Sequence, residues 1–185
     1  MKHSTLILVL GLPGAGKTTL AKQLAADLKL PLISKDDIKV KLFDVYGWKD
    51  RTESRKAGSA SYTIIDYIIE EQLRVGNSLI FESTFTPALD NEKFQNWQRQ
   101  YSVQYVQVYC YADHDVIRRR VAERAATNNR HVSAIEGEEG RQDLEKRLAR
   151  GRELLDIHGA VIEVDSTDFS TVDQAAITEQ IRDAI

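Results

Sequence analysis

The sequence predicts an α/β fold in which five parallel strands form a central sheet with helices on both faces. Short apolar runs alternate along the chain with longer segments of helical periodicity, an order typical of parallel sheets. The run Ser78–Glu82 is apolar on both faces, as in a central parallel strand. Because ligands of such folds bind at the carboxyl ends of the strands, we expect the functional site at that edge of the sheet.

The strands are predicted from short aliphatic or alternating runs that are bounded by glycine, proline or polar residues. They are expected at Thr5–Leu10, Pro31–Ile33, Ser78–Glu82, Val103–Tyr111 and Ala160–Val164.

The helices are predicted from apolar residues that recur at spacings of three and four. The first begins after a glycine-rich segment and reaches about Leu28, and Ser34 with Asp37 resembles a capping box at the start of the second. Further helices are expected over residues 54–75, 87–101, from Asp113 past Val121, over 141–157, and over 172–181. Residues 125–140 lack periodicity and are predicted to form a loop.

The composition of the 185-residue chain favours a single domain, residues 1–185, with a short lid at about 118–140. No apolar run approaches the roughly 20 residues of a membrane span, and the N-terminal strand runs directly into the glycine-rich segment. We therefore expect a soluble, cytoplasmic protein without a cleaved signal peptide. Cys110 is the only cysteine, which excludes an internal disulfide and a cysteine-based zinc site. The formal net charge of −3 argues against a protein that mainly grips nucleic acid.

Residues 11–18 match the phosphate-loop (P-loop) pattern G-x-x-x-x-G-K-S/T at every fixed position, between a predicted strand and a predicted helix. Glycine lets the backbone approach a polyphosphate closely, and the N–H groups at the helix start favour anionic oxygens. Lys17 is predicted to contact the β- and γ-phosphates, and the Thr18 hydroxyl to bind Mg²⁺. The candidate nucleotide-binding residues are Gly11, Pro13, Gly14, Ala15, Gly16, Lys17, Thr18 and Thr19.

Two carboxylates lie in the first turn of the helix that follows the second strand. In the predicted fold, the carboxyl end of that strand lies beside the γ-phosphate. A carboxylate at this position can accept a proton from an attacking hydroxyl or hold Mg²⁺ through water, and we assign that role to Asp36. Asp37 is more simply explained by the preference of helix N-termini for acids.

Five arginines surround the predicted lid, and two of them, Arg120 and Arg124, are four residues apart and so share a helix face. An arginine that closes over a transferred phosphoryl group stabilises its negative charge. Arg120, Arg124 and Arg130 are candidates for that role.

The chain resembles the zeta-toxin and polynucleotide 5′-hydroxyl-kinase branch of the small P-loop kinases. The resemblance lies in residues 11–19, the segment Ser34–Lys39, Glu82-Ser83-Thr84 followed by Pro87, and Arg120 with Arg124. It implies that Asp36 is the general base, that Lys39 contacts the acceptor substrate and that Arg124 is the best candidate for the lid arginine. It also implies that Glu82, Ser83 and Thr84 bind acceptor or order the metal, although that branch more often has Asp where Glu82 stands.

These observations predict an ATP- and Mg²⁺-dependent phosphotransferase that acts on a hydroxyl of a small molecule. A polynucleotide 5′-hydroxyl kinase and a non-catalytic nucleotide-binding switch stay open as alternatives. A GTP-specifying N-K-x-D motif is absent from the sequence, which favours ATP. No residue pattern identifies the acceptor, whose specificity we expect in residues 40–62, in residues 83–100 and in the lid.

Overall fold

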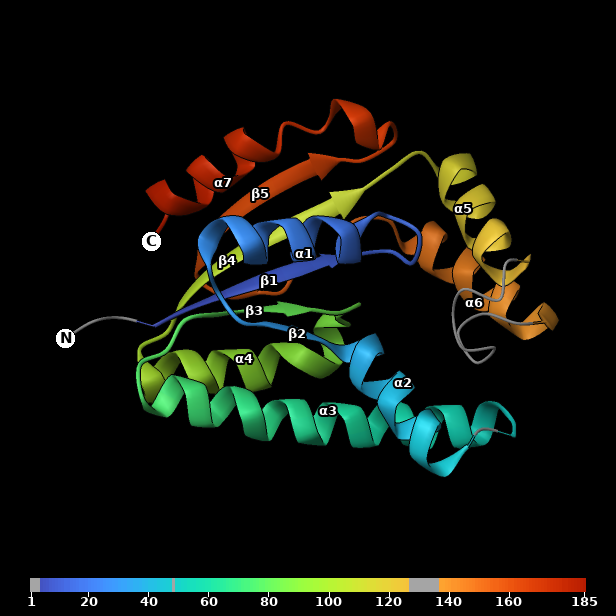
Figure 1. Cartoon of the computed structure of the whole chain (residues 1–185), viewed down its shortest axis with the longest axis horizontal. Helices are drawn as coiled ribbons and strands as arrows, with labels where there is room; N and C mark the ends of the chain where they lie inside the picture. Colours follow the sequence, from blue (N-terminus) through green and yellow to red (C-terminus); the bar gives the residue numbers. More distant parts are fainter. Residues whose placement is uncertain (1–3, 48, 127–136) are drawn as a thin grey trace.

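The computed structural model describes residues 4–47, 49–126 and 137–185. Its strands form one parallel sheet in the order β2-β3-β1-β4-β5, as the sequence predicts (Figure 1). The strands are β1 Thr5–Gly11, β2 Leu32–Ser34, β3 Leu79–Glu82, β4 Gln104–Tyr111 and β5 Gly159–Asp165.

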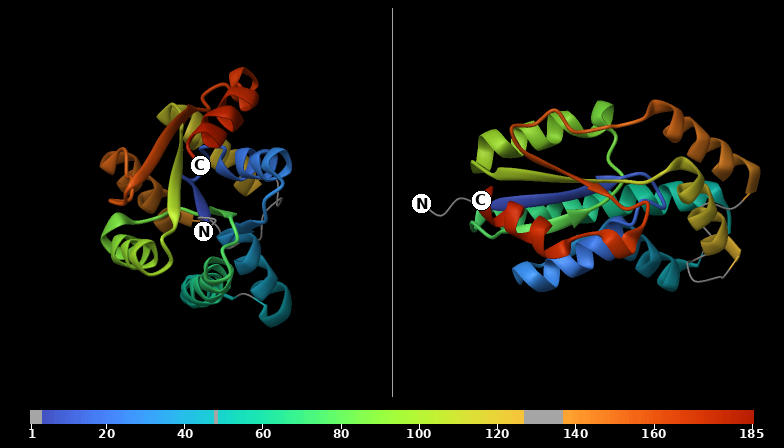
Figure 2. Two further views of the ribbon diagram at one scale, coloured as in Figure 1. Left: turned by 90° about the vertical axis from the view of Figure 1, so that its left-hand side faces the viewer. Right: turned by 90° about the horizontal axis from the view of Figure 1, so that it is seen from above.

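Helices cover both faces of this sheet. Helices α1 and α7 lie on one face and α3 and α4 on the other, whereas α5 and α6 stand beyond the carboxyl ends of the strands (Figures 1 and 2). The helices are α1 Lys17–Leu28, α2 Lys35–Tyr46, α3 Arg51–Arg74, α4 Pro87–Tyr101, α5 His114–Ala126, α6 Gly137–Arg150 and α7 Gln174–Asp183, with a 3-10 turn at Phe169–Thr171.

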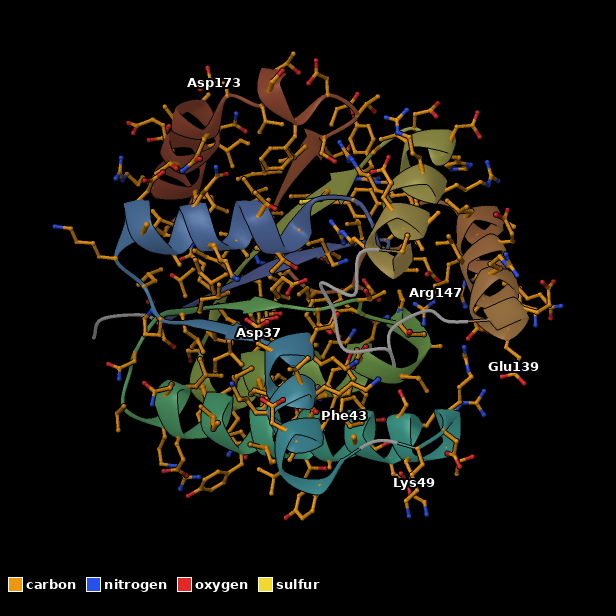
Figure 3. The ribbon with its side chains drawn as sticks, turned by 45° about the vertical axis from the view of Figure 1, so that its right-hand side comes forward. Asp37, Phe43, Lys49, Glu139, Arg147 and Asp173 are labelled. Atoms are coloured by element: carbon orange, nitrogen blue, oxygen red, sulfur yellow. The ribbon has the colours of Figure 1, made fainter. Side chains whose placement is uncertain are left out.

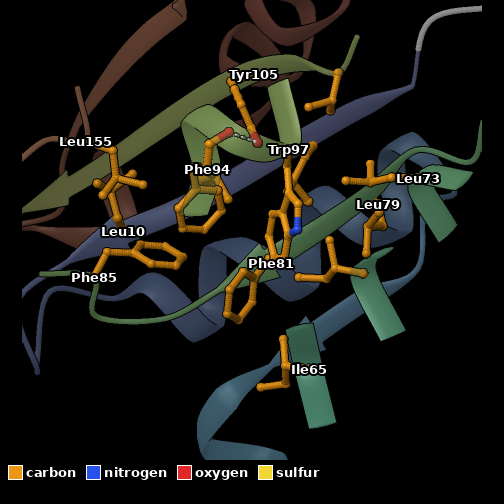
Figure 4. Close-up of a cluster of buried hydrophobic side chains, with 14 of the residues drawn as sticks. Leu10, Ile65, Leu73, Leu79, Phe81, Phe85, Phe94, Trp97, Tyr105 and Leu155 are labelled. Atoms are coloured by element: carbon orange, nitrogen blue, oxygen red, sulfur yellow. Dashed lines mark hydrogen bonds between the residues drawn. The ribbon is translucent and has the colours of Figure 1, made fainter. Parts of the chain in front are cut away.

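The core is divided by the sheet into two layers. Alternate β1 residues face opposite sides: Leu6, Leu8 and Leu10 pack with α3 and α4, while Ile7 and Val9 pack with α1 and α7. The first layer is rich in aromatic rings in edge-to-face contact, shown in Figure 4. Such pairs add to the free energy gained by burying their area. The layers hold β1 and β3 rigidly, and these strands position the segments that follow them.

Cys110 lies in the second layer, where it is 1% exposed. Burial raises the pKa of its thiol to about 12. Cys110 is therefore a packed, protonated thiol of the core. Among the residues that the structure describes, no helix has the length and apolar character needed to cross a bilayer.

The helix predicted nearest the C-terminal side of the lid has different bounds in the structure. The helix expected over 141–157 begins at Gly137 and ends at Arg150, because Gly151 takes a positive φ of 73°. Beyond it, the backbone of Leu155 exchanges hydrogen bonds of 2.9 and 3.0 Å with the side chain of Gln107 on β4. This long-range pairing leaves 151–158 irregular, and a local periodicity could not reveal it.

Helix α2 is not capped in the way that the sequence predicts. The Ser34 hydroxyl makes no cap hydrogen bond within the described residues, and instead donates to Glu82 Oε2 at 2.7 Å. The predicted capping box is therefore wrong.

Helix α3 begins earlier than expected, at Arg51, because the side chain of Asp50 accepts from the Glu53 N–H.

Candidate functional site

The P-loop, residues 11–18, joins β1 to α1 in the conformation that its glycines permit. Gly16 is the N-cap of α1 with φ 77°, and a Cβ on Gly11, whose φ is 136°, would lie 2.0 Å from the carbonyl oxygen of Cys110. No described side chain caps α1, and its first turn contains no acid. The N–H groups of this helix end are therefore available to an anion.

The side chain of Lys17 folds back over the P-loop. Its side chain is buried, and its Nζ donates to the carbonyl of Leu12 at 2.9 Å. This contact holds the ammonium group over the loop rather than in bulk water. Burial of a cation beside open backbone N–H groups favours binding of a multiply charged anion.

A small cavity of about 40 Å³, which we call the phosphate cavity, lies in front of the P-loop. It brings together residues predicted from four separate stretches of the sequence: Pro13, Gly14, Gly16, Lys17, Thr18, Asp36, Glu82, Thr84 and Arg124. Three predicted nucleotide-binding residues do not line this cavity: Gly11 ends β1, Ala15 is buried in the core and Thr19 is exposed on α1. The backbone carbonyl of Ala15 accepts a hydrogen bond of 3.0 Å from the Ser166 hydroxyl.

The oxygen donors around this cavity suit Mg²⁺. The hydroxyl of Thr18 and the carboxylates of Asp36 and Glu82 all line it. Mg²⁺ prefers oxygen ligands, and it is usually held by one or two protein groups together with substrate phosphates and water. In the described ranges, no three His, Cys, Asp or Glu side chains cluster as a metal site made of protein alone. Thr18 and Asp36 thus fit a cation that is shared with bound phosphates.

A larger cavity of about 470 Å³ adjoins the first one. We call it the outer cavity. Its lining comes from α2, α3, α4, α6 and the segment after β3: Pro13, Lys35, Asp36, Lys39, Val40, Phe43, Arg51, Tyr62, Glu82, Ser83, Thr84, Thr86, Leu89, Asp90, Lys93, Gly140, Asp143, Leu144 and Arg147. The two cavities share Pro13, Asp36, Glu82 and Thr84. A molecule in the outer cavity would therefore meet the phosphate cavity at Asp36.

Asp36 stands at this junction because β2 and β3 are neighbours and β3 pairs with β1. Its side chain is 43% exposed, and it lies 3.2 Å from Lys35 Nζ. The register sets Ser34 beside Glu82, and Val9 of β1 also faces Glu82. The carboxyl ends of three strands thus bring both acids to the mouth of the P-loop.

Two sets of hydrogen bonds hold Glu82, at the end of β3, and the two residues that follow it. Glu82 is 3% exposed and accepts from Ser34, while the Ser83 hydroxyl and the Tyr62 hydroxyl lie 2.7 Å apart. The Tyr62 hydroxyl also reaches the carbonyl of Thr84 at 3.3 Å. Burial raises the pKa of Tyr62 to about 12, so its proton is retained at neutral pH. The bond from Ser34 holds Glu82, and the contacts of Tyr62 hold Ser83 and Thr84, at the wall between the two cavities.

The predicted lid arginines, Arg120, Arg124 and Arg130, have different surroundings. Arg124 lines the phosphate cavity from α5, whereas Arg120 donates to backbone carbonyls of the P-loop and of the segment after β5. Arg130 lies outside the described residues. The direct part of Arg124 in catalysis stays a prediction, and the contacts of Arg120 give it a positioning role.

A family model described as an AAA domain matches residues 6–147. The chain belongs to this AAA domain family. The P-loop, both acids and Arg124 all fall within the matched residues. No curated protein matched the sequence.

Solved structures similar to this AAA domain include a proposed kinase from Chloroflexus aurantiacus, 36% identical over 98% of each chain, with a TM-score of 0.91. Two more distant structures share the fold. Shikimate kinase from Acinetobacter baumannii in complex with shikimate is 18% identical over 98% of this chain and 95% of its own, with a TM-score of 0.56. Kti12 from Chaetomium thermophilum in complex with ADP-AlF3 is 18% identical over 97% of this chain and 98% of its own, with a TM-score of 0.63.

Lys39 of this AAA domain lies inside the outer cavity, with its Nζ donating to the Ser54 hydroxyl at 2.7 Å. The pKa of Lys39 is lowered to about 8, mainly by burial and also by the positive charges of Lys35 and Arg51, while the carboxylate of Asp36 acts in the opposite direction. At neutral pH the side chain still carries its charge for most of the time. Because this pKa lies close to neutral pH, a change of charge nearby alters the fraction of Lys39 that is protonated.

We expect the substitution Arg51→Gln to raise the pKa of Lys39 above about 8, because it removes a positive charge that opposes protonation. Asp36→Asn should lower the same pKa, since it removes a carboxylate that favours the charged form. An NMR titration of lysine carbons next to Nζ measures both shifts. Arg55→Gln, an exposed change on the same helix, is the control and should leave the titration in place. Shifts of the opposite sign would contradict the described surroundings of Lys39.

Arg120 ties together two loops of this AAA domain. Its Nη2 donates to the carbonyls of Ser166 and Thr167 at 2.7 and 3.2 Å, and its Nη1 lies 3.4 Å from the carbonyl of Gly14. Hydrogen bonds from a charged donor stabilise a fold by about 1.5–3 kcal/mol each at most, and less where water competes.

Arg120→Leu should therefore lower the free energy of unfolding by about 1.5–3 kcal/mol and weaken nucleotide binding, because the P-loop is less firmly held. Denaturant unfolding and nucleotide titration measure the two effects. Arg119→Leu on the same helix is the control, since Arg119 is 66% exposed and makes only a 4.0 Å contact with Glu123. Unchanged stability with reduced turnover would instead support the catalytic role predicted from the sequence.

The sequence alone did not single out several outer-cavity residues of this AAA domain. These are Arg51 and Tyr62 on α3, Lys93 on α4, and Arg147 on α6. The segments that contain Arg51, Tyr62 and Lys93 were expected to hold specificity, but the individual side chains were not named. Arg147 lies beyond the predicted lid of about 118–140, in a segment for which no such role was predicted. Helical spacing identifies apolar residues that face a core, and it does not tell which polar residues of three separate helices face one another.

Proposed function

We propose that the protein is an ATP-dependent phosphotransferase that moves the γ-phosphate to a hydroxyl of a small molecule. The observation that carries this proposal is the junction of the two cavities at Asp36, Glu82 and Thr84. One cavity has the P-loop and Lys17 for a nucleotide, and the other has room for a separate molecule. A protein that only binds and hydrolyses nucleotide has no need of the second cavity.

In the proposed reaction Asp36 accepts the proton of the acceptor hydroxyl as its oxygen attacks the γ-phosphorus. The new oxygen–phosphorus bond forms while the bond from that phosphorus to the β,γ-bridging oxygen breaks, and ADP leaves. Lys17, the N-terminal N–H groups of α1 and Arg124 offset negative charge on the phosphoryl oxygens. Mg²⁺, when bound, would neutralise phosphate charge, with Thr18 and Asp36 as the residues that hold it.

The similarity to a proposed kinase over 98% of each chain supports this assignment, and the fold is shared with shikimate kinase. The narrower resemblance to the zeta-toxin and polynucleotide-kinase branch stays a prediction. Binding to nucleic acid is disfavoured by the net charge of −3.

The test is a screen with γ-labelled ATP, Mg²⁺ and a panel of hydroxyl compounds. The panel contains neutral sugars, sugar acids, sugar phosphates, nucleosides and a short RNA with a 5′-hydroxyl. We expect label in one class of small acceptor, with one ADP formed for each product. Label in the RNA would favour the polynucleotide kinase, and ATP hydrolysis without any labelled acceptor would favour the nucleotide-binding switch.

A further inference from the structure

The outer cavity is lined by five cationic side chains, and most of them have a carboxylate partner. Lys35 pairs with Asp36 at 3.2 Å, and Arg51 pairs with Asp143 at 2.9 Å and with Glu139 at 3.1 Å. A third pairing joins Lys93 to Asp66 at 2.9 Å. Each of these three cations has a carboxylate partner that offsets much of its charge, so none of them requires a charged ligand.

Arg147 differs from these three. It reaches the cavity from α6, and its Nη1 is buried without a hydrogen-bond partner among the described residues. The positions of Arg147 on α6 and of Phe43, another lining residue, on α2 can be followed in Figure 3. A buried donor that stays unsatisfied costs about 1–3 kcal/mol, and more on a charged group. A protein retains such a group where a ligand supplies the missing acceptor.

Lys39 is the second cation without a described ion pair. Its Nζ donates to the neutral hydroxyl of Ser54 at 2.7 Å, and Lys35 and Arg51 add positive potential around it. Since burial and these cations disfavour its charge, an anion placed beside it would be strongly favoured.

Apolar side chains complete the cavity. Val40 and Phe43 line it from α2, Leu89 from α4 and Leu144 from α6. Phe43 and Leu144 are buried, whereas Leu89 is 79% exposed. Beside the two buried side chains the effective dielectric is lower, which strengthens the attraction between an anion and nearby cations. The lining holds five cations and four carboxylates, and within it Arg147 and Lys39 are the two cations for which the described residues supply no ion pair.

We propose that the acceptor is an anionic alcohol, whose carboxylate or phosphate group is bound by Arg147 and Lys39 while its hydroxyl is presented to Asp36. This inference rests on the proposed function for the reaction, but the anion site itself can be tested without turnover. A planar guanidinium recognises either anion through paired hydrogen bonds, so the structure commits to the charge and leaves its source to experiment.

The experiment compares matched pairs of probes that differ mainly in one anionic group, in the presence of saturating ADP and Mg²⁺. Glycerate against glycerol and gluconate against glucitol test the carboxylate, and glucose 6-phosphate against glucose tests the phosphate. Calorimetry measures binding, and γ-labelled ATP measures transfer. We expect at least one anionic member to bind about tenfold or more tightly than its neutral partner.

Arg147→Met should reduce binding of the anionic probe by about 10- to 100-fold, to the level of its neutral partner, without lowering the melting temperature. Arg147→Lys should restore part of the loss. Arg150→Met on the same helix is the matched control, because Arg150 lies outside the cavity lining and pairs with Glu153.

The possible outcomes separate the two proposals. Equal binding within every pair, no binding of any anionic probe, or equal effects of Arg147→Met and Arg150→Met would overturn the anion site. Anionic binding that depends on Arg147 but gives no labelled product from any probe or from the wider acceptor screen would overturn the phosphotransferase and leave the anion site standing.

Discussion

Asp36→Asn is expected to lower the rate of phosphoryl transfer by about 10²- to 10⁴-fold, the usual contribution of a positioned general base. The amide has nearly the same size but cannot accept the hydroxyl proton. Asp36 lies at the junction of the two cavities and contacts Lys35, so its removal changes the reacting centre and leaves the P-loop backbone in place. Single-turnover transfer from labelled ATP to the acceptor measures the rate, and calorimetry measures nucleotide affinity.

The neighbouring substitution Asp37→Asn is the matched control. Asp37 is exposed in the first turn of the same helix and lines neither cavity. Its loss should reduce helix stability by a few tenths of a kcal/mol at most, about the value of a first-turn acid, and leave transfer unchanged. Full transfer by Asp36→Asn with normal nucleotide binding would remove the base from the proposed mechanism.

Lys17→Met is expected to reduce transfer by about 10²- to 10³-fold and to weaken binding of the nucleotide as well. The buried Nζ, fixed by the carbonyl of Leu12, is the cation most enclosed by the phosphate cavity, while Arg124 lines that cavity from an exposed position. Methionine keeps the length of the side chain and removes its charge. Nucleotide titration and transfer assays measure the two effects, and their pattern differs from that of Asp36→Asn, which spares binding.

Lys22→Met gives the comparison for this prediction, since Lys22 is an exposed lysine on the same helix. It should leave both nucleotide affinity and transfer unchanged. If Lys17→Met bound nucleotide as tightly as the unaltered protein, the charge of Lys17 would have no part in holding phosphate.

The order of strands and helices could be predicted because it depends on local pattern. Apolar runs such as residues 5–10 are too short for helices and are bounded by turn residues, and the observed parallel sheet confirms the predicted fold class. The early start of α3 comes from a local cap by Asp50, whereas two other errors occurred where a distant side chain replaced a local partner. Ser34 binds Glu82 rather than its own helix, and Leu155 pairs with Gln107 rather than continuing α6.

The two lid arginines show the same limit at the site. Arg120 and Arg124 are equivalent by helical spacing, yet the first contacts loop carbonyls and the second lines the phosphate cavity. One turn along α5 is enough to move a guanidinium between these surroundings. Spacing could place both on one face, and only the position of α5 against the P-loop distinguishes them.

The sequence by itself determined the P-loop and the approach of Asp36 and Glu82 to it, because closely spaced glycines and the ends of parallel strands specify those positions locally. The tertiary structure decided the composition of the outer cavity. Lys39, Lys93 and Arg147 come from three helices that are distant in the chain, and whether each finds a carboxylate partner depends on how those helices pack. The charge that the cavity presents to an acceptor is therefore a property of packing between helices, which no periodicity within a single helix encodes.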